Sequence, residues 1–219
     1  MKEMKLLAEW SYSPAKITRG YSRETLYVNL GNKDGKYEFK TRPVSPQMID
    51  TFIGGRGFGL KILWDGVKPT TKWNDPENEI VISGGPICGT TQYPGAGKSY
   101  SVFLSPLTEQ TYSSNAGGYF GPLLKFSGFD AFELQGKADR KVIVFIDGDN
   151  SKVQIFESNL EGPLNAYPVT EALHEYFAKD EEDKRNLSVV TAGEGALHSY
   201  WGCMNFSMYD LRRKAPKLK

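Results

Sequence analysis

Short glycine-rich segments carry most of the side chains in this sequence that could do chemistry. Pro94–Ser99 reads Pro-Gly-Ala-Gly-Lys-Ser, and Gly-Lys-Ser is the end of the phosphate-binding loop of nucleotide hydrolases. That loop also requires a glycine five residues before Gly97, where this chain has Gln92, and it must open a helix. Ser99–Leu104 alternates like a strand instead. We therefore do not expect a nucleotide hydrolase.

A second segment, Gly54–Gly59, presents Arg56 among its glycines. The glycines do not fall at the first, third and sixth positions of the dinucleotide-binding fingerprint, and the residues before them have helical rather than strand spacing. Taken alone, this segment predicts a structural tight turn with an attached guanidinium group.

The third segment, Ser113–Gly121, combines two hydroxyls, the Asn115 amide and the adjacent Gly117 and Gly118. Adjacent glycines let a ligand approach the main chain closely. If a helix begins near Gly118, its N-terminus would favour an anionic ligand. Taken alone, a loop and helix cap without a ligand is the simpler interpretation.

Other site chemistries find little support. Cys88 and Cys203 lie far apart in the sequence, as do His174 and His198, so these residues cannot form a closed four-ligand zinc or iron–sulfur site by themselves. We expect the cysteines to be reduced, in a cytoplasmic protein. Neither histidine lies in a glycine elbow, and we expect His174 on a helix surface. The run Glu181-Glu182-Asp183 is typical of a solvated turn.

Composition excludes several classes of protein. The 219 residues include 27 Lys plus Arg and 26 Asp plus Glu, which is not the basic bias of a dedicated nucleic-acid binder. Hydrophobic residues at 39% and aromatic residues at 13% argue against disorder. No apolar run approaches the ~20 residues of a membrane helix, and the charged first ten residues do not resemble a secretory signal. We expect one medium-sized domain.

The elements that must position the glycine-rich segments are mostly strands. Two hairpins are predicted, 26–30 with 36–40 around the turn 31–35, and 141–146 with 153–157 around 147–150. Further strands are predicted over 79–83, 99–104, 131–135 and 187–191. Ser45 and Pro46 open a helix that runs to about residue 53, and other helices are expected around 60–64, over 119–126 and over 170–179 with Thr170 as its cap; 111–118 is expected to be a loop. Few scattered helices among strands predict an α+β fold whose base is mainly β-sheet, with two packed sheets.

The end of the chain is basic. Five of the last eight residues are positively charged: Arg212, Arg213, Lys214, Lys217 and Lys219. A solvated tail is the simplest interpretation. A binding patch, or a point where a larger protein would continue, are the alternatives.

Taken in order, the segments resemble the N-terminal domain of the aldehyde ferredoxin oxidoreductase family, the tungsten–pterin enzymes. Each matching segment is weak alone, but their order and spacing from about residue 22 to 205 are specific. We therefore expect residues 1–21 to be an extension, 22–205 the tungstopterin-binding domain, and 206–219 a basic tail where the family's chain would continue. The segments are Phe52–Gly57, Asp75–Asn78, Gly85–Thr90, Ser105–Thr108, Ser114–Gly121, Leu124–Ala131, Gly136–Ala138 and Ala192–Gly195.

The resemblance implies a sheet base under a bis-pterin cofactor whose tungsten is held by pterin sulfurs. Asn115 matches the asparagine whose backbone carbonyl helps hold the magnesium that bridges the two pterin phosphates. Gly117 matches a backbone contact to the pterin, with Ala116 and Gly118 shaping the same loop. Lys98 matches a common arginine near the pterin; lysine keeps the charge but loses the planar fork. Arg56 is the remaining predicted cofactor contact.

The family's cluster-binding cysteine motif and later helical domains are absent from this sequence. The resemblance therefore implies a small subunit or N-terminal part of an aldehyde-oxidising enzyme. Its 4Fe-4S cluster would lie on a partner part or large subunit, in a hetero-oligomer that passes electrons to ferredoxin. An aromatic acyl-thioester reductase subunit is the alternative within the family. A non-catalytic assembly module that has lost the cofactor is the alternative outside enzymes.

Overall fold

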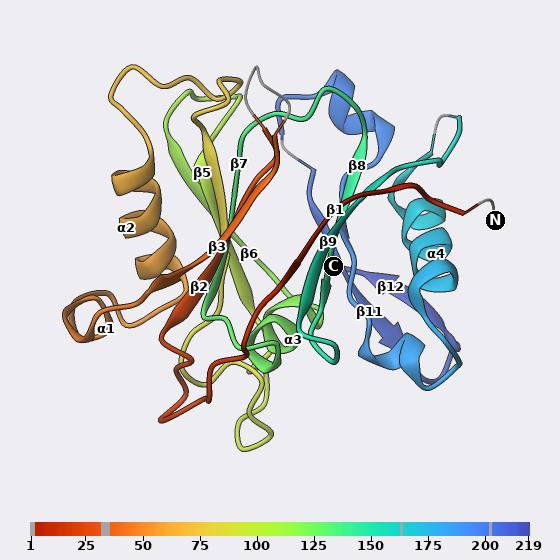
Figure 1. The fold of residues 1–219 in the computed structure, drawn as a ribbon, viewed down its shortest axis with the longest axis horizontal. Helices are drawn as coiled ribbons and strands as arrows, with labels where there is room; N and C mark the ends of the chain where they lie inside the picture. The colour runs from red at the N-terminus through yellow and green to blue at the C-terminus, as the bar shows by residue number, and fades with distance from the viewer. Residues whose placement is uncertain (1–2, 32–35, 163, 202) are drawn as a thin grey trace.

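The computed structural model describes residues 3–31, 36–162, 164–201 and 203–219. The strands within these ranges form three sheets, and four α-helices pack around them (Figure 1). The α+β class with a mainly sheet base is confirmed. The expected number of two sheets was wrong, because C-terminal residues that the sequence analysis assigned to a tail form part of a third sheet.

A six-stranded sheet carries the glycine-rich segments. Its strand order is β3-β2-β7-β4-β5-β6, and all neighbours are antiparallel except the parallel pair β2 and β7. The predicted strands at 79–83, 99–104 and 131–135 are confirmed, as is the pairing of the first hairpin; residues 32–35 of its turn lie outside the described residues. The bounds are β2 Glu24–Asn29, β3 Glu38–Pro43, β4 Glu79–Ser83, β5 Ser99–Leu104, β6 Thr111–Ala116 and β7 Ala131–Gln135.

Strand β6 corrects the prediction of a loop over 111–118. It pairs antiparallel with the whole of β5, from Ser99 opposite Ala116 to Leu104 opposite Thr111. The strand is at the edge of the sheet, and most of its polar residues are exposed. An edge strand that faces solvent needs no apolar alternation, so the sequence carries no strand signal there.

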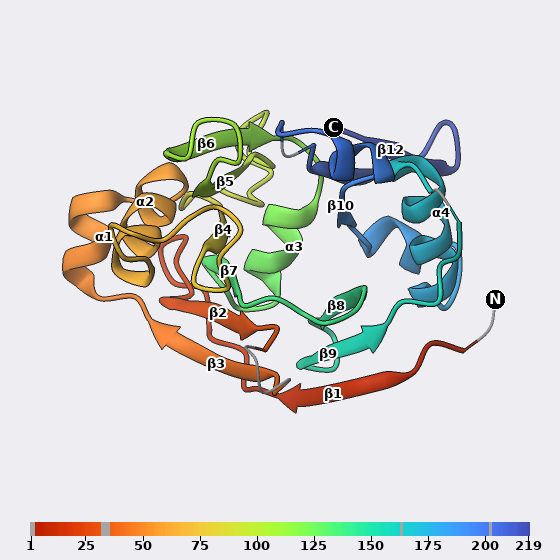
Figure 2. The same ribbon diagram turned by 90° about the horizontal axis from the view of Figure 1, so that it is seen from above.

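Helices α1, Pro46–Phe52, and α2, Arg56–Gly66, cover one face of this sheet, while α3 and the other two sheets lie toward its opposite face (Figure 2). Ser45 caps α1 as predicted, since its side chain accepts a hydrogen bond from the Met48 N–H at 3.1 Å. α2 packs on β4 and β5. The approach is close at Gly59, where a Cβ would lie 2.4 Å from Val102 Cγ2.

The second sheet has the order β1-β9-β8 and contains the predicted second hairpin, β8 Val142–Asp147 with β9 Lys152–Glu157. Strand β1, Leu6–Ser11, pairs antiparallel with β9. Residues 1–21 were expected to be an extension with no predicted strand, so β1 is a new element of the fold.

The third sheet corrects the expectation of a solvated tail. Its strands are β10 Val190–Thr191, β11 Asn205–Asp210 and β12 Ala215–Leu218. Phe206 and Tyr209 of β11 are only 2% and 5% exposed. The basic side chains of the tail therefore belong to a β-hairpin. The predicted strand over 187–191 is shorter than expected, with two residues in the ladder.

Helix α3, Phe120–Phe126, confirms the prediction over 119–126. Helix α4, Ala166–Phe177, begins before the predicted 170–179 and is capped by Asn165, whose side chain accepts from the Tyr167 N–H at 3.0 Å. Thr170 is inside the helix and donates its hydroxyl to the Ala166 carbonyl. His174 is 2% exposed, so its predicted surface position was wrong. Two short 3₁₀ helices, Asp183–Asn186 and Glu194–His198, complete the helical elements of the described residues.

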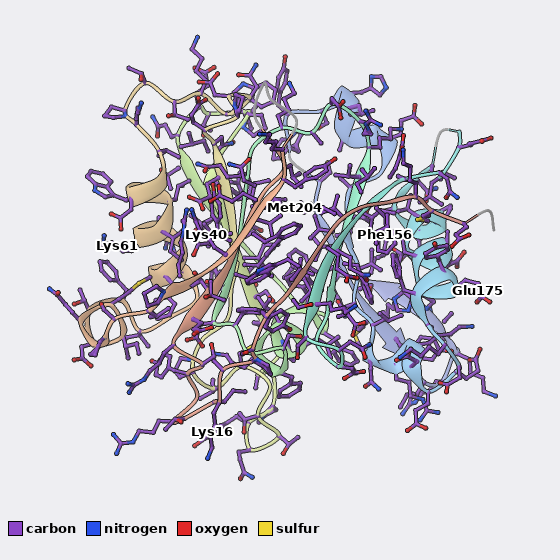
Figure 3. The ribbon with its side chains drawn as sticks, viewed as in Figure 1. Lys16, Lys40, Lys61, Phe156, Glu175 and Met204 are labelled. Atoms are coloured by element: carbon purple, nitrogen blue, oxygen red, sulfur yellow. The ribbon has the colours of Figure 1, made fainter. Side chains whose placement is uncertain are left out.

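The main core lies between the six-stranded sheet, α3 and the β8–β9 hairpin. Leu26, Phe129 and Ile155 are among its buried members, and Met204 packs against it near the centre of the molecule (Figure 3). Phe156 extends the apolar contacts toward α4, with its ring centroid 5.5 Å from that of Phe177. This packing makes the six-stranded sheet a rigid base for the residues at its edge.

Candidate functional site

Lys98 and Asn115, predicted from separate motifs, are in contact. The Lys98 ammonium donates to Asn115 Oδ1 at 3.1 Å. The contact follows from strand register, because Ser99 and Tyr100 of β5 lie opposite Ala116 and Asn115 of β6. Lys98 and Asn115 are both exposed, so the pair is available to a ligand. The Gly97-Lys98-Ser99 segment leads into a strand, as predicted, and not into a nucleotide-binding helix.

Gly117 and Gly118 follow β6 and turn the chain into α3. Gly118 has φ +104°, and a Cβ there would lie 2.8 Å from the Ser207 carbonyl oxygen, so only glycine fits. Gly97 lies against the same turn, with its Cβ position 3.1 Å from the Gly118 oxygen. The two glycine-rich segments therefore pack together.

Gly117 differs from Gly118 because there is space for a side chain at its Cβ position. The nearest atoms to its Cβ position are in the Lys219 side chain, at 3.6 Å or more. That is ordinary van der Waals contact with a flexible side chain, and the chain's own packing does not require glycine at this position. Lys219 is a neighbour of the predicted site that the sequence analysis missed. Its only sequence signal was the basic ending, which favoured a solvated tail.

Arg56 lies at the start of α2, beyond a turn that is tied to the end of β4. Gly55 has φ +52° and donates its N–H to the Gly84 carbonyl at 2.9 Å. The Cβ position of Gly55 is 3.5 Å from the Tyr100 ring, and Tyr100 is the residue opposite Asn115. Arg56 is exposed and has no hydrogen-bond or ion-pair partner within the described ranges. Arg56 thus follows a turn that packs against Tyr100, the strand neighbour of Asn115.

Cys88 lies beneath the segment that carries Lys98. It is buried, and its thiol is 3.9 Å from the Lys98 carbonyl oxygen. Burial raises the pKa of the Cys88 thiol, which keeps it protonated and unsuited to hold a metal. Both cysteines are free, and Cys203 is exposed. Among the residues that the structure describes, no three or more His, Cys, Asp or Glu side chains group closely enough to hold a metal ion.

The predicted site is a surface rather than a cavity. A cavity with a volume of about 970 Å³ lies elsewhere in the described part of the chain, lined mostly by apolar side chains that include residues of α3, β8 and α4. The surface combines exposed cations, an amide and closely packed glycine backbone. That combination suits a large anionic group that lies along the main chain. The roles of the individual residues stay predictions.

A family profile described as "Aldehyde ferredoxin oxidoreductase, N-terminal domain" matches residues 25–215. The chain belongs to this family. It is 36% identical over 174 residues to the tungsten-containing aldehyde ferredoxin oxidoreductase of Pyrococcus horikoshii. That alignment covers 80% of this chain and 27% of the relative. It is 33% identical over 137 residues to the aliphatic sulfonate oxidoreductase, WOR-like subunit, of Pyrococcus furiosus, covering 61% of this chain and 21% of that protein.

Among solved structures, the chain is similar to the active site complex BamBC of benzoyl coenzyme A reductase in complex with 1,5 dienoyl-CoA. The TM-score is 0.64 at 28% sequence identity, and the match covers 72% of this chain and 23% of that chain. The chain thus spans about a quarter of the length of the proteins it matches. No helix within the described residues is long and apolar enough to cross a membrane.

Proposed function

We propose that this chain is the small subunit or N-terminal part of a tungsten bis-pterin oxidoreductase and forms the floor on which the cofactor lies. The observation that carries the proposal is the exposed pair of Lys98 and Asn115 beside Gly117, a glycine that the chain's own packing does not require. Membership of a family with tungsten-containing relatives supports the same role. Residues 22–205 would be the cofactor-binding domain.

The residues fit a cofactor that carries phosphates. Arg56 and Lys98 supply exposed positive charge, which phosphate groups need in a site that is open to water. Gly117 allows the backbone of Ala116–Gly118 to approach the pterin, and the Asn115 backbone carbonyl would contact a magnesium ion between two phosphates. When bound, the cofactor would supply the redox chemistry, while the chain binds and orients it.

The favoured reaction is oxidation of an aldehyde with water to a carboxylic acid. The two electrons would pass through a 4Fe-4S cluster, held by the rest of the enzyme or by a large subunit, to ferredoxin. The name of the Pyrococcus horikoshii relative, an aldehyde ferredoxin oxidoreductase, supports this substrate class. Because the chain spans only about a quarter of those relatives, the catalytic groups would lie in the remaining part, in a cytoplasmic hetero-oligomer of an anaerobic organism.

A second candidate function is reduction of an aromatic acyl thioester. The similarity to the benzoyl coenzyme A reductase complex, at a TM-score of 0.64, supports it. An activity panel on the complete enzyme separates the two candidates. Turnover of aldehydes with a ferredoxin-type acceptor supports the first, and turnover of aromatic acyl thioesters with a low-potential donor supports the second.

The role as cofactor floor is tested by substituting Gly117 with valine in the complete enzyme. Because a Cβ there meets only the Cβ, Cγ and Cδ atoms of Lys219, at 3.6 Å or more, we expect the variant to fold but to lose most of its tungsten and pterin. Gly195→Val is the matched control, since no atom lies within 4 Å of the Gly195 Cβ position. Tungsten and molybdenum are measured by mass spectrometry and pterin by the fluorescence of its oxidised form. Full cofactor content in Gly117→Val and in Asn115→Asp would contradict the proposal and favour a non-catalytic module.

A further inference from the structure

Two glutamates lie buried side by side on the face of the six-stranded sheet that α2 covers. Glu79 of β4 and Glu133 of β7 are 0% and 1% exposed. They share a face because Val81, two residues from Glu79, pairs directly with Glu133. Val81 packs against Phe58 of α2, which identifies the covered face. Two carboxylates in such a place are costly unless their charge is compensated.

Among the described residues, a single cation forms ion pairs with these glutamates. Arg42 of β3 forms an ion pair with Glu133, and its Nη1 lies 3.6 Å from Glu79 Oε1. The Arg42 guanidinium is held over the Tyr27 ring of β2, 3.8 Å from the centroid. The Thr25 hydroxyl donates to the other oxygen of Glu133. Two acidic groups therefore share one positive charge.

The other charged side chains on β3, and Lys61 and Asp65 on α2, form ion pairs with residues outside this pair. Lys40 of β3 forms an ion pair with Glu38, and its Nζ lies over the Tyr27 ring, 4.6 Å from the centroid. On α2, Lys61 (labelled in Figure 3) forms an ion pair with Asp65, and both side chains are partly exposed. None of these groups neutralises the second carboxylate.

Within the described part of the chain, the Glu79 carboxyl group has no hydrogen-bond partner at either oxygen. It is pressed against the last residue of α2, since a Cβ on Gly66 would lie 2.0 Å from Glu79 Oε2. The carbonyls at a helix C-terminus carry partial negative charge, which disfavours an ionised carboxylate beside them. As carboxylates, Glu79 and Glu133 are both acceptors only. An added proton turns one of them into a donor and provides the missing hydrogen bond.

We propose that Glu79 and Glu133 form a buried binding site for one proton, held between the two carboxyl groups at neutral pH and released in alkaline solution, where its loss loosens the C-terminal end of α2. The electrostatics support this site, since burial and the neighbouring Glu133 raise the pKa of Glu79 to about 8.

The direction of the pH dependence follows from this shift. An unfolded chain releases the Glu79 proton near pH 4.5, whereas the folded chain keeps it until about pH 8. Between these values the folded state binds more protons, so stability falls as pH rises and levels off above about pH 8. The effect reaches the candidate site through α2, because Arg56 is the first residue of the helix whose last residue, Gly66, contacts Glu79.

The test is an infrared titration of the complete protein, with Glu79→Gln and the exposed Glu38→Gln as variants. A protonated carboxyl group has a C=O stretch that is distinct from the bands of carboxylates. At about pH 6 ordinary glutamates are ionised, so we expect one such band in the wild type and in Glu38→Gln, and none in Glu79→Gln. The band should disappear as the pH is raised through about 8. Absence of the band in the wild type, or its survival in Glu79→Gln, would overturn the proposal.

Thermal unfolding is the second readout. We expect the melting temperature of the wild type to fall between about pH 6 and pH 9, and that of Glu79→Gln to fall much less. Addition of Mg²⁺ or Ca²⁺ at about pH 9 should not restore the wild-type melting temperature; restoration would mean that the pair binds a metal cation, and the proton site would be wrong. If Glu79→Gln does not fold, the infrared titration of the wild type decides alone. Neither readout depends on the cofactor.

Discussion

Replacing Lys125 with methionine removes one half of an ion pair inside the protein. The Lys125 ammonium contacts the Asp130 carboxylate and donates to the Gly20 carbonyl at 2.9 Å. The two side chains are 3% and 1% exposed. Asp130 also accepts hydrogen bonds from the Ser22 and Arg23 N–H groups, at 3.1 and 2.8 Å. The pair therefore ties the start of β2 to the end of α3.

The expected loss in free energy of unfolding arises because Lys125→Met leaves the Asp130 carboxylate buried without its ion-pair partner. Removing one partner of a buried pair typically costs ~3–5 kcal/mol, because the other charge stays buried without compensation. The two backbone donors offset part of the uncompensated charge on Asp130, so we expect Lys125→Met to lower the free energy of unfolding by about 3–4 kcal/mol. That is a large part of the ~5–15 kcal/mol of a typical domain.

The measurement is guanidinium unfolding of the chain followed by tryptophan fluorescence. Lys61→Met is the matched control, because Lys61 pairs with Asp65 in an exposed position and an exposed pair is worth ~0–1 kcal/mol. Asp130→Asn and the double variant complete a mutant cycle, in which we expect the double variant to lose less than the sum of the single losses. Hydrogen exchange at Ser22 and Arg23 should accelerate in Lys125→Met. The reasoning is refuted if Lys125→Met costs no more than Lys61→Met.

Two further predictions concern Gly118 and the buried His174. Gly118→Ala should lower the free energy of unfolding by about 2–3 kcal/mol, because φ is +104° and the new Cβ meets the Ser207 carbonyl. Gly162→Ala is the control, because Gly162 has φ +86° but no atom within 4 Å of its Cβ position. It therefore measures the cost of the backbone conformation without the steric clash. Burial lowers the pKa of His174 from 6.5 to about 4. The folded state therefore binds fewer protons than the unfolded chain between these values, and stability is lost as pH falls through this window, by roughly 3 kcal/mol at most. His174→Gln should flatten the profile between about pH 4 and pH 7; an unchanged slope would show that another group titrates there.

The sequence predicted best those elements whose apolar pattern is local. Glu79–Ser83, Ser99–Leu104 and Ala131–Gln135 were predicted at the residues where the strands lie, because they are central strands buried by neighbours on both sides. Ser45 and Pro46 likewise placed the start of α1 through a local capping interaction. Such signals are contained in a few consecutive residues.

Elements that depend on a distant partner were missed. The polar edge strand β6 is a strand because β5 offers it a ladder. The hairpin of β11 and β12 is held by pairing within itself and by α4, so its lysines and arginines misled a prediction that used charge alone. His174 is buried by the third sheet, where its Nε2 lies 3.2 Å from the Ser207 hydroxyl, and no local pattern reports that neighbour.

By itself the sequence determined the family, through the order of its glycine-rich segments, and it singled out Arg56, Lys98, Asn115 and Gly117. Only the tertiary structure brought Lys98 into contact with Asn115, placed Lys219 over Gly117 and enclosed Glu79 with Glu133 under α2. The reason is physical. A motif records which side chains are present within a short stretch of chain, whereas register, burial and charge compensation arise when strands that are distant in sequence pair and exclude water between them.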